Sequence, residues 1–177
     1  MTQPQTSKKS APSHPQRRPN SVEWVWFLSI TLIGAALDLW SKHAVFAWLE
    51  RTQNHRYTLI DGFLRFIIAE NPGAAFSLFS GMQWLFIGVS LGALIAVNSL
   101  FCLGRLTSRW TLTAMACINA GVIGNLYDRL FNEGRVRDFI DVYVGNCHWP
   151  TFNVADSLLC IGVGILLITS LTAAEKK

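Results

Sequence analysis

Four long apolar runs, separated by polar segments, dominate the pattern of hydrophobic and polar positions along the chain. They cover about residues 22–40, 84–103, 110–127 and 152–171. A run of about 18 or more apolar residues is long enough to cross the hydrocarbon core of a bilayer as a helix. Because little chain remains for a separate soluble domain, the pattern predicts an all-α membrane protein with four transmembrane helices in one domain, 22–173.

The first 21 residues contrast with these runs. They are rich in Pro, Ser, Gln and basic residues and hold too little apolar surface to fold alone, so we expect a disordered tail over 1–21. Basic residues before an apolar run also occur in signal peptides. However, this run is long for a signal peptide and has no A-x-A-like cleavage site after it, which favours an uncleaved helix.

Basic residues cluster in the tail, in the short turn between the second and third runs, and after the fourth run. They are Lys8, Lys9, Arg17, Arg18, Arg105, Arg109, Lys176 and Lys177. The positive-inside rule assigns these segments to the cytoplasm, so we expect both termini there. The longer segments, about 41–83 and 128–151, then lie outside. They also hold basic residues, but mixed with acidic ones and spread over a greater length.

The composition and charge of the chain agree with a membrane protein. Of the 177 residues, 51% are hydrophobic and 15% are charged, and the formal net charge is +4. The basic residues flank apolar runs instead of clustering on a soluble face, so they indicate membrane topology and no nucleic-acid partner. Cys147 is the one cysteine outside the runs, so we expect no intrachain disulfide. The histidines are scattered without H-E-x-x-H spacing, so we expect no metal and no cofactor.

Polar residues interrupt three of the runs at related positions. The first run ends near Asp38 and Lys42, the third ends near Asn125, Asp128 and Arg129, and the fourth begins with Asn153 and Asp156. Since the first and third runs are directed outward and the fourth inward, these groups share one depth near the outer surface. Charges in a membrane segment are costly and mark candidate functional sites.

Each group also has a simpler interpretation. Asp38 and Lys42 are four residues apart on one helix face and could form only an interfacial ion pair. Asp128 and the residue after it could be a helix end that reaches the headgroups. Asn153 could merely cap the fourth helix. Three such coincidences at one depth are less expected than one shared polar site.

The groups among these residues that could catalyse a reaction are carboxylates. Two aspartates in a partly dry site cannot both ionise easily, so one keeps a proton while the other takes a proton from water. Such a pair can hydrolyse an amide without a metal or a covalent intermediate. Asp156 is one member, and the spacing leaves Asp128, Asp138 and Asp141 open as its partner.

Five short motifs in order resemble those of the lipoprotein signal peptidases, the type II signal peptidases of bacteria. They are DLWSK (38–42), NPGAAF (71–76), GNLYDR (124–129), VRDFID (136–141) and FNVADS (152–157). The resemblance implies an aspartic endopeptidase of the inner membrane. Its substrate is a prolipoprotein with a diacylglyceryl cysteine, and cleavage just before that cysteine removes the signal peptide. We expect membrane lipid as its surroundings, and nothing in the sequence demands more than a monomer.

The resemblance also assigns residues. It implies Asp138 and Asp156 as the catalytic pair, with the active site near the outer surface, and leaves Asp141 facing solvent or the loop. The implied substrate-binding residues are Asp38, Lys42, Asn71, Gly73, Asn125, Asp128, Arg129 and Asn153. Family similarity further implies a small extracytoplasmic sheet between the first two helices. Strands and a short helix are therefore expected over about 56–81, with a turn at Asp61-Gly62.

Two other classes of function fit part of the pattern. A small transporter would use the aspartates as relay groups, but transporters tend to place them near the midplane and to show internal repeats, which are not seen here. A non-enzymatic membrane scaffold would need no pair of carboxylates.

Overall fold

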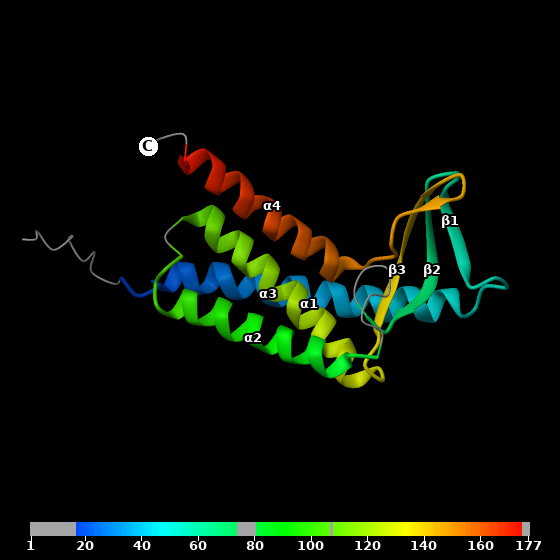
Figure 1. Ribbon diagram of the computed structural model, residues 1–177, viewed down its shortest axis with the longest axis horizontal. Coiled ribbons are helices and arrows are strands. Elements are labelled where there is room, and N and C mark those ends of the chain that lie inside the picture. The colour runs from blue at the N-terminus through cyan, green and yellow to red at the C-terminus, as the bar shows by residue number, and fades with distance from the viewer. Residues whose placement is uncertain (1–16, 74–80, 107, 175–177) are drawn as a thin grey trace, which may run out of the picture.

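In the described part of the chain, four helices run side by side, and a small sheet lies across one end of them (Figure 1). The computed structural model describes residues 17–73, 81–106 and 108–174. The helices are α1 (Ser21–Leu49), α2 (Gln83–Cys102), α3 (Arg109–Phe131) and α4 (Val154–Ala174). α3 contacts each of the other three, so it forms the centre of the helical part. Most of the predicted tail, 1–16, and most of the predicted short helix, 74–80, lie outside the described residues.

α1 is longer than the sequence pattern predicts. It begins at a capping box, in which the side chain of Asn20 accepts from the Glu23 N–H at 2.9 Å and Glu23 accepts from the Asn20 N–H at 2.8 Å. The predicted end near residue 40 is wrong, since the helix continues to Leu49. No Pro or Gly interrupts residues 41–49, and Lys42, Phe46 and Leu49 are buried on one side of the helix, so the fall in hydrophobicity does not mark a helix end.

The sheet is antiparallel, with strands in the order β1-β2-β3-β4. The strands are β1 (Arg56–Ile60), β2 (Leu64–Asn71), β3 (Val136–Val144) and β4 (Cys147–His148). The sequence predicts strands only in the first outer segment, whereas β3 and β4 come from the second. Gly62, in the turn expected between β1 and β2, has φ +73, a conformation that glycine adopts without strain. The two outer segments thus form one sheet, which carries Asp138 on β3.

Two glycines on α3 let its neighbours approach closely near the sheet. A Cβ at Gly121 would lie 2.5 Å from the carbonyl oxygen of Ala155 on α4. A Cβ at Gly124 would collide with the carboxylate of Asp38 on α1. The absence of these side chains brings the polar residues of α1, α3 and α4 into contact.

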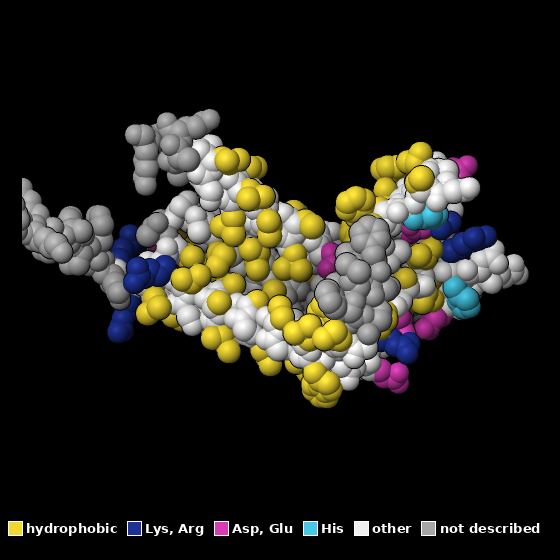
Figure 2. All heavy atoms as spheres, in the orientation of Figure 1, with side chains coloured by type: hydrophobic (Ala, Val, Ile, Leu, Met, Phe, Trp, Pro, Cys, Tyr) yellow, Lys and Arg dark blue, Asp and Glu magenta, His cyan; other side chains and the backbone are white. Residues whose placement is uncertain are grey.

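The exterior of the helical part is apolar. Hydrophobic side chains spread over it, while Arg side chains gather at the end where α1 begins, and basic side chains also lie around the sheet at the other end (Figure 2). Among the described helices, α1, α2 and the stretch Val154–Thr172 of α4 are long and apolar enough to cross a membrane. α3 is less apolar because it carries inward-facing polar residues, among them the buried Asn119, Asn125 and Asp128. The chain is therefore a mostly helical protein with three candidate membrane helices and a small antiparallel sheet.

Candidate active site

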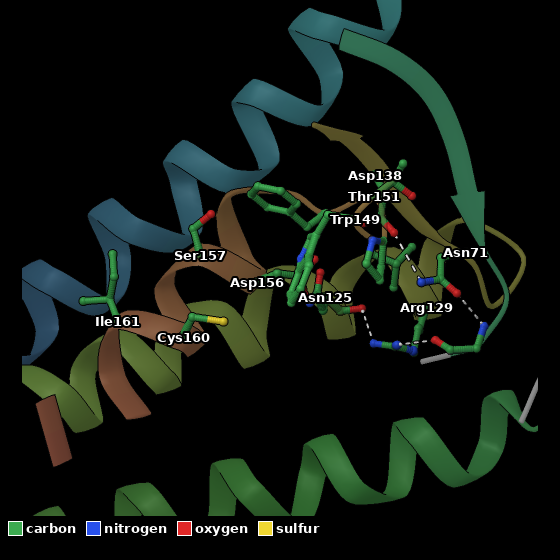
Figure 3. A pocket seen from close by; sticks show the side chains of 14 residues that line it. Asn71, Asn125, Arg129, Asp138, Trp149, Thr151, Asp156, Ser157, Cys160 and Ile161 are labelled. Atoms are coloured by element: carbon green, nitrogen blue, oxygen red, sulfur yellow. Dashed lines mark hydrogen bonds between the residues drawn. The ribbon is translucent and has the colours of Figure 1, made fainter. Parts of the chain in front are cut away.

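A cavity of about 580 Å³ opens where the end of α3, the start of α4 and β3 meet. Most of its wall is apolar, and polar side chains gather in one part of it (Figure 3). These polar residues include Asn71, Asn125, Arg129, Asp138 and Asp156. Two carboxylates and three potential hydrogen-bond donors therefore face one space.

α4 begins with a reciprocal cap. The N–H of Asp156 donates to Oδ1 of Asn153 at 2.9 Å, and the N–H of Asn153 donates to Oδ2 of Asp156 at 3.2 Å. This arrangement satisfies two backbone donors at the helix start and places a carboxylate at its positive end. The interpretation of Asn153 as a helix cap is confirmed, but its side-chain amide also reaches beyond the helix.

Asp138 lies on β3 and is 1% exposed. It accepts hydrogen bonds from the side-chain amides of Asn153 at 2.7 Å and Asn71 at 3.3 Å. Burial raises the pKa of Asp138 to about 7, and the nearby carboxylate of Asp156 adds to the rise. Near neutral pH this carboxyl group therefore carries a proton in a substantial fraction of molecules.

Asn125, on α3, joins the second carboxylate to the centre of the helical part. Its side-chain amide donates to Oδ1 of Asp156 at 2.8 Å. Its side-chain oxygen accepts from Nζ of Lys42 at 3.0 Å and from the amide of Asn153 at 3.2 Å. The orientation of the Asp156 carboxylate is thus fixed from both α3 and the start of α4.

A buried network of charges lies beneath the cavity. Nζ of Lys42 lies 2.7 Å from Asp38 and 3.2 Å from Asp128, and all three side chains are fully buried. Asp128 also accepts from the guanidinium of Arg137 at 2.6 Å, and Asp38 accepts from the Ala155 N–H at 2.8 Å. Each buried charge has a partner of opposite sign, as burial in a medium of low dielectric requires. The network fastens α1, α3, α4 and β3 to one another.

Arg129 occupies the rim of the cavity. It donates to the carbonyl oxygens of Gly73 at 3.2 Å and Asn125 at 3.4 Å. The N–H of Gly73 in turn donates to the side-chain oxygen of Asn71 at 3.0 Å. These bonds tie the segment after β2 to α3.

Comparison with known proteins identifies the family. The family model described as Signal peptidase (SPase) II matches residues 30–172, well over half of the chain. The chain belongs to the signal peptidase II family. Its members include the lipoprotein signal peptidase of Francisella tularensis subsp. novicida (strain U112), 40% identical over 156 residues that cover 85% of this chain and 94% of that protein. The lipoprotein signal peptidase of Photorhabdus laumondii is 34% identical over 160 residues, which cover 88% of this chain and 92% of that protein.

Solved structures agree with this family assignment. The chain is similar to two structures that are each described as a bacterial membrane enzyme, with TM-scores of 0.78 and 0.72. Both are 27% identical in sequence to this signal peptidase II chain. The alignments cover 93% of this chain and 96% of the first structure, and 89% of this chain and 98% of the second.

The residues named from the sequence motifs are brought together in this signal peptidase II fold. All ten lie within the matched region, and a continuous set of hydrogen bonds and ion pairs joins them. The shared depth of the polar groups on α1, α3 and α4 is confirmed by the contacts of Lys42 with Asn125 and of Asn125 with Asp156.

One expectation about an individual residue is wrong. Asp141, expected to face solvent or the loop, is 1% exposed and lies 2.6 Å from Nε of Arg65. Asp128, named from the motifs as a substrate-binding residue, pairs with Lys42 and Arg137. Both partners come from other elements, so local spacing could not indicate them.

Arg137 was not named in advance as a site residue. Its ion-pair partner, Asp128, lies on α3, and no sequence spacing indicates this contact between a strand and a helix. Trp149, which lines the cavity, is likewise not among the site residues predicted from the sequence. Among the described residues, no group of three or more His, Cys, Asp or Glu side chains is arranged to hold a metal ion, and Cys102, Cys117, Cys147 and Cys160 are free thiols.

Proposed function

We propose that this protein is a membrane aspartic endopeptidase that removes the signal peptide from diacylglyceryl-modified prolipoproteins, just before the modified cysteine. Membership of the lipoprotein signal peptidase family supports peptidase activity on prolipoproteins. One observation carries the two-carboxylate mechanism. Asp138 and Asp156 line one cavity, and Asn153 donates a hydrogen bond to each.

In this proposal Asp138 and Asp156 have different roles. Asp138, whose pKa is raised to about 7, holds a proton and donates it to the carbonyl oxygen of the scissile amide. The Asp156 carboxylate takes a proton from a water molecule, whose oxygen attacks the carbonyl carbon. The resulting tetrahedral diol collapses when the C–N bond breaks and the amine leaves with a proton from the Asp156 carboxyl group. Asp138 recovers its proton from the diol hydroxyl, so the pair returns to its initial state.

The surrounding residues hold the pair and the peptide. Asn71 and Asn125 each donate to one carboxylate and so fix its orientation. Arg129, Asn71 and Gly73 at the rim lie where the peptide backbone enters the cavity. Asp38, Lys42, Asp128 and Asn153 support the substrate site through the buried network, which holds the helices in register.

The same proposal includes an arrangement in the membrane. All four helices cross the bacterial inner membrane, with α3 shielded by the others, and residues 22–173 form one peptidase domain after a cytoplasmic tail, 1–21. The Arg residues at the end where α1 begins support a cytoplasmic position for that end. The sheet and the cavity then lie near the outer surface, where the scissile bond of a lipid-anchored substrate is presented, and the enzyme acts as a monomer surrounded by lipid.

Purified protein in detergent, incubated with a diacylglyceryl-modified prolipoprotein, tests this function. Mass spectrometry of the products is expected to show a free signal peptide and a mature protein that begins with the modified cysteine. The same prolipoprotein without the diacylglyceryl group is the matched control and is expected to be cleaved far more slowly. Intact modified substrate, or cleavage at another bond, would contradict the proposal.

A further inference from the structure

A second group of polar and aromatic side chains lies on the face of β3 opposite to Asp138. Asp141 accepts from Nε of Arg65 at 2.6 Å, and Nδ1 of His148 lies 3.0 Å from its other oxygen. The guanidinium of Arg65 lies 4.6 Å from the ring centre of Tyr143, and that ring stacks on His148 at 5.4 Å and 17°. These four residues, called here the Asp141 cluster, close a ring of contacts across β2, β3 and β4.

The Asp141 cluster contacts β4 through the side chain of His148. β4 has only two residues, Cys147 and His148, and so contributes few backbone hydrogen bonds of its own. His148 lies opposite Tyr143 in the pairing of β3 with β4. A buried carboxylate shared by two partners is a stronger and more directional restraint than so short a ladder. The Asp141 cluster therefore adds a side-chain restraint on β4 to the backbone hydrogen bonds that join this segment to β3.

Strand geometry turns the next residue, Trp149, toward the cavity. Successive side chains of an extended chain point to opposite faces, so His148 and Trp149 face opposite ways. The N–H of Trp149 continues the pairing by donating to the Val142 carbonyl oxygen at 2.9 Å. Trp149 lines the same cavity as Asp138, and Figure 3 shows it among the side chains around that space.

Trp149 is 66% exposed although it lies at the cavity wall. Such a large apolar ring has much surface left to bury, and tryptophan is prominent among residues that dominate binding energy at interfaces. Its neighbours in the lining, Pro150 and Phe152, extend the apolar surface toward α4. An extended peptide that reaches the two carboxylates has to pass this wall.

We propose that Trp149 contacts the apolar peptide segment beside the scissile bond and that the Asp141 cluster is a positioning device for this tryptophan. The inference rests on the proposed peptidase function and deepens it. Asp141 takes no part in proton transfer, because its carboxylate is occupied by Arg65 and His148 on the face away from Asp138. The cluster determines how tightly the peptide binds, and the carboxylate pair determines how fast it is cut.

Steady-state kinetics on the modified prolipoprotein test this separation. Trp149→Ala is expected to raise KM about tenfold and to change kcat by less than about twofold, because it removes a contact made equally in the ground and transition states. Trp149→Phe keeps an apolar ring, so its KM is expected to lie close to that of the wild type. A fall in kcat at unchanged KM, or no change in either constant, would overturn the role of Trp149.

A double-mutant cycle tests the positioning role of the cluster. Asp141→Asn alone is expected to raise KM several-fold, but to add little in a Trp149→Ala background, since its effect passes through the tryptophan. Arg135→Ala is the matched control because its exposed ion pair joins the residue before β3 to Glu70 on β2, and it is expected to leave KM unchanged. Independent effects of Asp141→Asn and Trp149→Ala would overturn the cluster's role. Wild-type protein that cleaves no prolipoprotein would instead overturn the proposed function itself.

Discussion

The side-chain amide of Asn153 donates to the carboxyl group of Asp138 across 2.7 Å, and this bond joins the start of α4 to β3. The backbone N–H of Asn153 also donates to Asp156 at 3.2 Å. One residue therefore touches both carboxylates that line the cavity. The helix cap fixes the position of that residue, so local helix chemistry and the geometry of the carboxylate pair are coupled.

Substitution of Asn153 is expected to separate these two roles. Asn153→Ser keeps a side-chain oxygen that can cap α4 but has no amide to reach Asp138, whereas Asn153→Ala loses both. We expect both variants to lower kcat about a hundredfold, the usual cost of one lost donor in an active site. Only the alanine variant is expected to melt at a clearly lower temperature. Cleavage by Asn153→Ser at the wild-type rate would contradict the role of the amide.

The pKa of Asp138 predicts how cleavage depends on pH. Burial, and then the charge of Asp156, raise this pKa from 3.8 to about 7. If Asp138 must hold its proton to donate it, the rate falls as the pH rises through about 7. The measurement is kcat/KM against pH, with detergent and substrate held constant. A rate that rises through this range would show that Asp138 does not act as the acid.

The same shift predicts a dependence of stability on pH. The folded state holds the proton of Asp138 more tightly than the unfolded state does. The contribution of this proton to the free energy of unfolding is therefore complete below about pH 4 and is lost as the pH rises to about 7. Asp138→Asn mimics the protonated form, so we expect it to melt above the wild type at about pH 8 and near it at about pH 4. Asp61→Asn, in the exposed turn of the sheet, is the control and is expected to show no such difference.

Removal of the buried cation Lys42 is expected to destabilise the protein strongly. Lys42→Met leaves the carboxylates of Asp38 and Asp128 buried without their shared partner, which costs about 3–5 kcal/mol. Adding Asp38→Asn removes the charge that is left without a cation, because Asp128 keeps its pair with Arg137, and is expected to recover part of the loss. The free energy of unfolding of both variants is measured by reversible unfolding in mixed micelles. Equal stability of Lys42→Met and the wild type would contradict the importance of this ion network.

Local spacing predicted the parts of the site that belong to single helices. Asp38 and Lys42 pair as residues four apart on one helix do, and Asn153 with Asp156 forms the expected cap. Helix directions predicted that these groups meet at one depth. Those predictions succeed because helix geometry relates sequence separation directly to position in space.

Contacts across the sheet could not be predicted in this way. Asp138 and Asp141 lie three residues apart in one segment, and nothing local tells which faces the cavity and which faces Arg65. The choice depends on the pairing of β2 with β3, where the register shifts between Phe66 and Ala69. Family resemblance supplied Asp138 for the candidate pair, but it did not indicate that Asp141 is buried.

We propose that Asp138 and Asp156 together cleave the peptide bond. This proposal is tested most directly by the kcat of Asp138→Asn and Asp156→Asn on a diacylglyceryl-modified prolipoprotein, after gel filtration and melting show that both variants are folded. We predict that each variant loses at least about a thousandfold in kcat, since Asp138→Asn removes the group that donates a proton to the carbonyl oxygen and Asp156→Asn removes the group that takes a proton from water. Turnover by either variant at a rate near that of the wild type would contradict it.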